Sequence, residues 1–309
     1  MGTDPILAAF DISATQCRRV ADSNVLSAYW ELTKPEINFL IAITTAAGFW
    51  LASPEARNHF PWMLFLHTLL GTFFVASGAA TLNQLIELQY DAQMRRTARR
   101  PLASGRIAPP RALWFGVLLS VFGIVYLAFS TNALASLLAA LTLLSYLFLY
   151  TPLKRITPLC TLVGAIPGAA PPLIGWAAAR GRLDPLAWVL FAIVFLWQFP
   201  HFMSIAWMYR EDYRRAGYLV LPRSELKDRF VACQCLLPAL GLFPVAIVPA
   251  RCGQSGIVYF AGALVLGSIF LYFSTRFALQ RSMACARHLL FASIFYLPVL
   301  FALLALDKK

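Results

Sequence analysis

The chain has 309 residues, of which 60% are hydrophobic and only 13% are charged. This composition is too apolar for a soluble domain and is typical of a helical protein that crosses a membrane several times. The net charge of +12 could indicate a nucleic-acid partner, but the cations lie in short segments between long apolar runs. Because the loops of membrane proteins collect Lys and Arg, we expect a lipid bilayer as the surroundings and no nucleic acid as a partner.

The N-terminal segment, residues 1–28, mixes polar and apolar residues without a long hydrophobic core. We expect it to form a cytoplasmic tail, because the pair Arg18 and Arg19 is too little to define a mitochondrial targeting segment. A short helix along the membrane surface is expected near residues 24–33. Residues 29–309 are expected to form one membrane domain.

Nine apolar runs follow the tail, and each is close to the ~20 residues that a helix needs to cross a hydrocarbon core. Residues that interrupt helices separate the runs, such as Ser53-Pro54, Pro109-Pro110 and Asp184-Pro185. The predicted fold class is therefore all-α, a polytopic membrane bundle of nine transmembrane helices. The predicted spans are 36–53, 62–86, 112–130, 133–150, 159–178, 186–207, 231–250, 256–275 and 287–306.

Loop charges predict the orientation of these spans. With the N-terminus inside, 20 of the 26 Lys and Arg fall in inner segments and six fall in outer segments. Because positive residues are kept on the cytoplasmic side, we expect a multi-pass protein of the bacterial inner membrane, with its N-terminus in the cytoplasm and its C-terminus outside. The mitochondrial inner membrane is the second choice. Both long polar loops, 87–111 and 208–230, then face the cytoplasm.

The first candidate site begins at the inner end of the second span. Asn83, Glu87 and Asp91 are four residues apart, so on a continuous helix their oxygen-bearing side chains would share one stripe about 12 Å long. The cations that follow are Arg95, Arg96, Arg99, Arg100, Arg106 and Arg111. Hard oxygen ligands beside fixed cations suit a polyphosphate held through Mg²⁺. An amphipathic helix end with a basic loop explains the same residues equally well.

Two further polar features end the sixth and the fourth spans. His201 and Asp212 are eleven residues apart, so on one helix they would face nearly the same direction. An ionisable residue within a span suggests a lined cavity, whereas the alternative is an imidazole bonded between two helices. At the end of the fourth span, Lys154 could meet a phosphate and Tyr150 could line the mouth of a cavity. An aromatic residue and cations at the membrane interface are the alternative.

The order of residues 83–107 is N-x-x-x-E-x-x-x-D-x-x-M-x-R-T-x-x-R-P-L-x-x-G-R-I. This pattern resembles the first signature of the UbiA superfamily of intramembrane prenyltransferases, and it is most similar to the branch that acts on protohaem IX. The resemblance covers residues 28–306. The supporting stretches are Leu32-Thr-Lys-Pro-Glu36, Tyr150-Thr-Pro-Leu-Lys154-Arg155, Trp197-Gln-Phe-Pro-His201-Phe and Asp212-Tyr-x-x-Ala-Gly217-x-x-x-Leu-Pro222.

The resemblance implies a nine-helix bundle that transfers farnesyl from farnesyl diphosphate to a vinyl group of haem B, giving haem O and diphosphate. It implies that Asn83, Glu87 and Asp91 hold Mg²⁺ and the diphosphate. The residues implied to bind or neutralise the substrate are Arg95, Arg96, Arg100, Tyr150, Lys154 and Tyr213. A membrane enzyme that modifies the product haem is the implied downstream partner.

The resemblance also assigns roles to the second polar loop. Asp212 would hold a second metal, and His201 would act at the haem end, as an axial ligand or as a polar group near the vinyl. Many relatives have a second D-x-x-x-D, whereas here Ala216 follows Asp212 after four residues. The haem branch shares this reduced form.

Three other functions remain as alternatives. A related prenyltransferase could use an aromatic acid or quinone precursor, which the Phe199-Pro-His201-Phe stretch opposes. A transporter built on an internal repeat would place charges near the middle of the membrane, whereas these charges cluster at one face. A haem-binding assembly factor without catalysis would leave Asn83, Glu87 and Asp91 without a purpose.

The predicted orientation can be tested by thiol labelling. Cysteines introduced at Ser104 and Ser224, in a background without the native Cys, should resist a membrane-impermeant thiol reagent in intact cells and react after lysis. The reason is that both polar loops are expected in the cytoplasm. Labelling of either position from outside would overturn the orientation.

Overall fold

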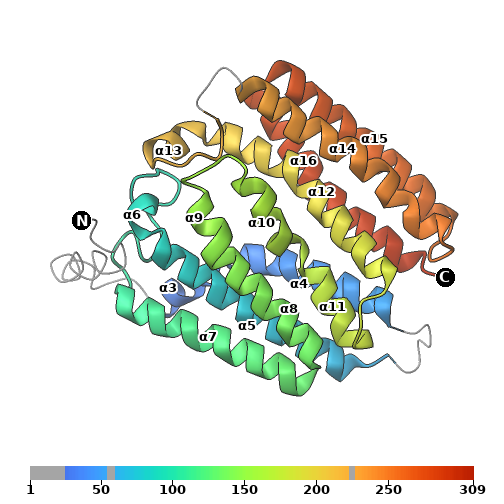
Figure 1. Ribbon diagram of the computed structural model, residues 1–309, viewed down its shortest axis with the longest axis horizontal. Helices are drawn as coiled ribbons and strands as arrows, with labels where there is room; N and C mark the ends of the chain where they lie inside the picture. The colour runs from blue at the N-terminus through green and yellow to red at the C-terminus, as the bar shows by residue number, and fades with distance from the viewer. Residues whose placement is uncertain (1–24, 54–59, 223–226) are drawn as a thin grey trace.

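The computed structural model describes residues 25–53, 60–222 and 227–309, and in this part of the chain the regular elements are helices (Figure 1). The longer helices are α3 (Val25–Leu32), α4 (Pro35–Ala52), α5 (Trp62–Ile86), α7 (Pro109–Ser130), α8 (Ala133–Leu144), α10 (Cys160–Ala169), α11 (Pro171–Arg180), α12 (Pro185–Met208), α14 (Lys227–Arg251), α15 (Ile257–Gln280) and α16 (Met283–Leu306). Four short elements complete the list: α6 (Leu88–Asp91), the π-helix η2 (Ser145–Tyr150), α9 (Thr151–Leu153) and α13 (Arg210–Arg215).

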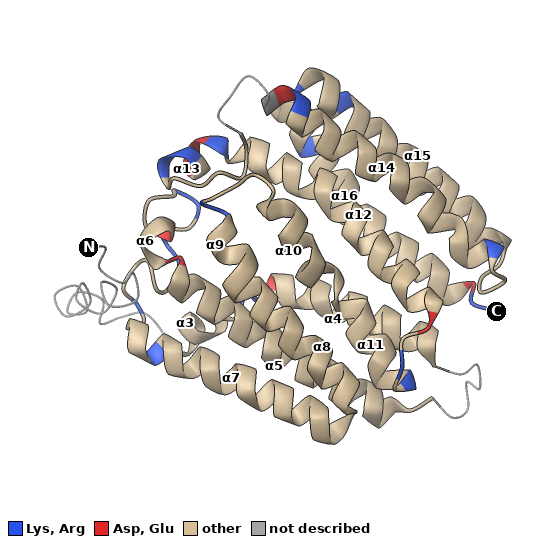
Figure 2. Ribbon diagram, in the orientation of Figure 1, with Lys and Arg blue, Asp and Glu red and all other residues tan. Residues whose placement is uncertain are grey.

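Nine helical segments of the described chain are long and apolar enough to cross a membrane, which confirms the predicted all-α bundle. The fourth segment runs through α8, η2 and α9, and the fifth runs through α10 and α11. The last span begins at Met283 instead of 287, because the Ser282 side chain caps the helix by accepting a hydrogen bond from the Cys285 N–H. Figure 2 shows charged residues gathered at helix ends and long tan middle sections. This is a multi-pass membrane protein.

The predicted short helix near residues 24–33 is α3. Leu26 and Trp30 are exposed on it, and its Glu31 pairs with Arg106 at 2.6 Å. At its end, the Leu32 carbonyl accepts a hydrogen bond from the Gln84 side chain at 2.9 Å. The helix is therefore tied to α5 and to the loop that contains the first signature. Residues 1–24, most of the expected tail, lie outside the described residues.

The fifth span is the most buried of the nine and lies in the middle of the bundle (Figure 1). Its α11 half packs directly on α4 through small residues. A Cβ atom at Gly175 would overlap the Thr45 carbonyl, and one at Gly48 would overlap the Pro172 carbonyl. The two backbones are therefore in contact, which fixes the direction of α4 and the place where its first residues lie.

The close packing of α4 on α11 predicts a stability effect. Gly175→Ala should destabilise the protein by about 1–3 kcal/mol, because two backbones would have to separate. Gly241→Ala in α14 is the matched control, because its Cβ would meet only the Leu196 methyl groups, at 3.6 and 3.8 Å. Thermal unfolding in detergent would measure both variants. Equal unfolding midpoints for the two would contradict this account of the contact.

Candidate active site

A cavity of about 120 Å³ lies at the end of the bundle where α6, α9 and α13 meet, which we call the signature end. Its wall is formed by the start of α4, the α5–α6 junction and the loop after α6, η2 and the end of α9, α10, α12, and α13 with the segment after it. Its charged lining residues are Lys34, Glu87, Asp91, Arg96, Arg100 and Lys154. Four cations and two carboxylates give the cavity an excess of positive charge.

The first signature turns at Glu87, so the predicted continuous helix is wrong in detail. Helix α5 ends at Ile86, Glu87 has φ −92° and ψ 6°, and α6 follows. Helical hydrogen bonds nevertheless continue through the turn, from the Glu87 N–H to the Asn83 carbonyl at 3.0 Å and from the Asp91 N–H to the Glu87 carbonyl at 2.8 Å. The spacing of four residues therefore still brings all three side chains to the cavity.

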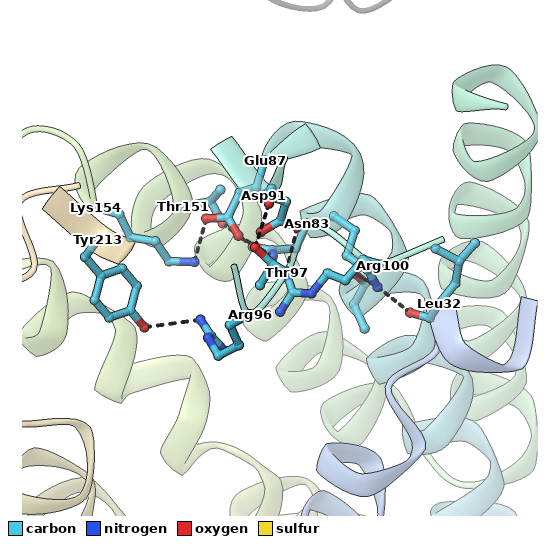
Figure 3. Close-up of polar contacts among 12 residues, drawn as sticks. Leu32, Asn83, Glu87, Asp91, Arg96, Thr97, Arg100, Thr151, Lys154 and Tyr213 are labelled. Atoms are coloured by element: carbon cyan, nitrogen blue, oxygen red, sulfur yellow. Dashed lines mark hydrogen bonds and ion pairs between the residues drawn. The ribbon is translucent and has the colours of Figure 1, made fainter. Parts of the chain in front are cut away.

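Both carboxylates of the first signature are held by cations (Figure 3). Lys154 Nζ lies 2.7 Å from Glu87 Oε1, and Arg100 Nη1 lies 2.6 Å from Asp91 Oδ2. Burial, the largest single influence, raises the pKa of Glu87, but Lys154, Lys34 and Asn83 together outweigh it and the pKa is lowered. Burial raises the pKa of Asp91, and Arg100 opposes that rise.

Asn83 completes this polar layer. Its amide donates to Glu87 Oε2 at 2.8 Å, and its Oδ1 accepts from the Thr151 hydroxyl at 2.9 Å. Thr151 directly follows Tyr150, and both belong to the end of the fourth span with Lys154. The first signature and the fourth span are thus joined by a neutral hydrogen bond and an ion pair, and Tyr150 also lines the cavity.

The oxygen atoms of this layer fit a Mg²⁺ ion. Asp91 Oδ1 is buried and has no hydrogen-bond partner among the described residues, so it is an open acceptor beside the cavity. In that same part of the chain, no group of three or more His, Cys, Asp or Glu could hold a metal ion. A few protein oxygens together with phosphate and water oxygens are what Mg²⁺ prefers, so the site suits an ion that arrives with a phosphate group.

The second polar loop forms the opposite side of the signature end. Asp212 Oδ2 accepts from the Arg96 backbone N–H at 3.4 Å. The Tyr213 hydroxyl accepts from the Arg96 guanidinium, also at 3.4 Å (Figure 3). The Asp212 carboxylate also pairs with Arg215 at 3.4 Å. Tyr213 and Arg96 line the cavity, whereas Asp212 is buried just outside its lining. The structure thus brings the two signature segments together.

The predicted continuous helix through His201 and Asp212 is wrong, because the chain turns at Tyr209. Helix α12 ends at Met208, Tyr209 has φ −107° and ψ 21°, and α13 begins at Arg210. Tyr209 marks the point at which the chain leaves the apolar run and becomes rich in charge.

His201 lies on the side of α12 that faces α16. Its Nδ1 is 2.8 Å from the Ser293 hydroxyl, and its ring stacks on Trp197 with centroids 4.7 Å apart. The next residue, Phe202, lines the cavity, but His201 does not. The contact with Ser293 is the bond between helices that the sequence allows as an alternative. The role of His201 at a haem stays a prediction.

Lys34 and Tyr218 are two of the lining residues to which the sequence analysis gave no role. Lys34 has φ 50°, a left-handed conformation that is uncommon for a residue other than glycine, and it begins α4 just before Pro35. Burial, followed by the nearby Arg100, lowers the pKa of Lys34 to about 7. The sequence feature that could have identified Lys34 is its place as a lone cation directly before the first span, inside the Leu32–Glu36 stretch. Arg95, in contrast, is exposed and lies outside the lining.

Comparison with known proteins supplies the family. The family model described as the UbiA prenyltransferase family matches residues 41–296. The chain belongs to this family. A protein named protoheme IX farnesyltransferase from Solibacter usitatus is 51% identical over 289 residues, which cover 91% of this chain and 98% of that protein. The resemblance inferred from the signature motifs is confirmed.

Solved structures share the fold of this UbiA-family chain. A digeranylgeranylglyceryl phosphate synthase superposes with a TM-score of 0.75 and 17% identity, over 92% of this chain and 99% of the other. A UbiA homologue from Archaeoglobus fulgidus bound to GPP and Mg²⁺ superposes with a TM-score of 0.61 and 16% identity, over 90% of this chain and 99% of that one.

Proposed function

We propose that this UbiA-family prenyltransferase transfers farnesyl from farnesyl diphosphate to a vinyl group of haem B, giving haem O and diphosphate. The observation that carries the proposal is the cavity at the signature end, where paired carboxylates, surplus cations and the open Asp91 oxygen meet. The similarity to the Solibacter usitatus farnesyltransferase supports haem as the acceptor. A quinone precursor as acceptor is the alternative.

The charged residues of the cavity would bind the diphosphate. Asn83, Glu87 and Asp91 would hold it through Mg²⁺, and the ion would supply charge stabilisation to the leaving group. Arg96 and Lys34 are the lining cations whose charged groups contact no carboxylate among the described residues, and of the two only the Arg96 guanidinium is always protonated. The cations assigned to the diphosphate are Lys34, Arg96, Arg100 and Lys154, and exposed Arg95 would act at the rim. Donors fixed in place before the reaction lower its barrier most effectively.

The apolar part of the lining would protect the allylic cation. When the C1–oxygen bond breaks, its electron pair leaves with the diphosphate, and the cation must reach the vinyl group before water does. Tyr146, Tyr150 and Phe202 line the cavity beside the charged layer. Aromatic faces stabilise cations, and a site closed to water prevents early hydrolysis. The new C–C bond leaves positive charge on the former vinyl group, which one water molecule neutralises as it adds a hydroxyl and releases a proton.

His201 would act at the haem end of the same reaction. It lies next to Phe202 on α12, and its Nδ1 is bonded to Ser293, which leaves Nε2 as the nitrogen for iron. A histidine that binds a metal commonly has its other ring nitrogen in a hydrogen bond. Asp212, buried against Arg96 and Arg215, would act by positioning this side of the site, or would hold a second metal.

The proposed function also implies a location and an orientation for the protein in the cell. The signature end would face the cytoplasm of a bacterium, with the nine spans in the inner membrane, the N-terminus inside and the C-terminus outside. The support is the excess of inner Lys and Arg in the sequence and the gathering of both signatures at one end of the bundle. A membrane enzyme that further modifies the haem would receive the product.

The proposed reaction can be tested in membranes that express the protein. Supplied with haem B and farnesyl diphosphate, they should form a pigment whose mass equals haem B plus a farnesyl group and a hydroxyl. Asp91→Asn should lower the rate by about 100-fold or more, because it removes charge from a carboxylate assigned to Mg²⁺. Glu211→Gln is the matched control, because Glu211 is exposed and its ion pair among the described residues is with Arg214, at 2.8 Å. Farnesylation of a quinone precursor and not of haem would contradict the proposal.

The role of His201 is tested by spectroscopy of the purified protein. His201→Ala should change the Soret band of bound haem and leave the affinity for farnesyl diphosphate nearly unchanged, because iron would lose an imidazole ligand. Asp91→Asn should show the reverse pattern and serves as the control. If His201→Ala weakens diphosphate binding while the haem spectrum stays the same, His201 belongs to the diphosphate end.

A further inference from the structure

The segment after α13 folds back over the cavity and contains a residue with no assigned role, Tyr218. Gly217 has φ 73°, a left-handed conformation that glycine adopts without strain, and it reverses the chain. The Tyr218 N–H then bonds the Tyr213 carbonyl at 2.9 Å, and the Leu219 N–H bonds the Lys154 carbonyl at 2.7 Å. Backbone bonds on both sides therefore fix where the Tyr218 side chain lies.

The ring of Tyr218 is held by aromatic contacts. It is 5% exposed, and its centroid lies 5.7 Å from that of Tyr90 and 6.0 Å from that of Tyr213. Met94 from the first signature belongs to the same apolar cluster. Such packing orders the side chain before any substrate arrives, so its hydroxyl has a fixed position in the lining of the cavity.

The hydroxyl of Tyr218 is buried near the Glu87 carboxylate, but the two do not meet in hydrogen-bond geometry, and no other described residue bonds this hydroxyl. A buried hydroxyl without a partner is costly, and native proteins rarely keep one without a reason. Glu87 is already satisfied by Lys154 and Asn83. A phenol keeps its proton at neutral pH, so the hydroxyl of Tyr218 is available as a donor.

The residues around the Tyr218 hydroxyl indicate which kind of acceptor could bind to it. Lys34, Arg96, Arg100 and Lys154 line the same cavity, which therefore attracts anions. Two of these cations, Arg100 and Lys154, are already paired with carboxylates. The neutral Tyr218 hydroxyl would give a bound anion one more hydrogen bond without adding charge to the cavity. The oxygen of a phosphate group is the acceptor that suits such a set.

We propose that Tyr218 is a further catalytic residue, whose hydroxyl donates a hydrogen bond to an oxygen of the departing diphosphate. The inference rests on the proposed function, because that function supplies the diphosphate. As the bond between farnesyl C1 and the bridging oxygen breaks, both bonding electrons stay on the oxygen, and Tyr218 keeps its proton throughout. A hydrogen bond from a donor fixed in place strengthens as that negative charge develops.

The test compares Tyr218→Phe with Tyr90→Phe in the purified full-length protein. Both changes remove one hydroxyl from the same cluster, but Tyr90 does not line the cavity. Tyr218→Phe should lower kcat/KM by about 10- to 100-fold, the usual effect of losing a hydrogen bond to a charged group. It should also weaken the binding of inorganic pyrophosphate with Mg²⁺, measured by calorimetry, by about tenfold. Tyr90→Phe should change neither quantity more than about twofold.

The two readouts separate the possible failures. If the unmodified protein does not bind pyrophosphate with Mg²⁺, the proposed diphosphate site is wrong. If it binds and Tyr218→Phe binds equally well, the assignment of Tyr218 is overturned, whatever happens to the rate. A loss of rate with unchanged pyrophosphate affinity would mean that the hydroxyl supports packing and does not contact the leaving group.

Discussion

The ion pair between Lys154 and Glu87 is the interaction on which the signature end depends. Both side chains are largely buried, and their separation is 2.7 Å. A charge taken out of water costs several kcal/mol unless a partner compensates it, so removing one member of such a pair typically costs about 3–5 kcal/mol. The pair joins two segments 67 residues apart, and the Thr151 bond to Asn83 lies directly beside it. The fourth span and the first signature are therefore bound to each other by charge and not only by apolar contact.

This pairing also determines what the cavity can attract. With Glu87 and Asp91 each matched by a cation, Arg96 and the partly protonated Lys34 remain in the lining without a carboxylate partner among the described residues. An anion that enters does not have to overcome the carboxylates, because their charge is already compensated. A divalent ion bound to the open Asp91 oxygen could connect the first signature to the anion. The arrangement thus favours an anion that arrives with its metal over either one alone.

The sequence predicted the spans well because long apolar runs bounded by Pro, Gly and charge leave few alternatives in a membrane. It also predicted the Asn83, Glu87 and Asp91 set, because spacing by four residues survives the turn at Glu87. The alignment of His201 with Asp212 assumed one continuous helix, which the turn at Tyr209 interrupts. Tyr218 could not be found by periodicity, because its position follows from a backbone reversal and from contacts with residues far away in the chain.

The central claim is that the signature end binds a metal–diphosphate pair at the first signature. The most direct measurement is an experimental structure with farnesyl thiodiphosphate and Mn²⁺, with the metal located by its anomalous scattering. The account predicts one metal peak at ligand distance, about 2.0–2.2 Å, from an Asp91 oxygen, with the diphosphate between it and Arg96. A metal and a diphosphate bound elsewhere, with the Asp91 oxygen still without a ligand, would contradict the account.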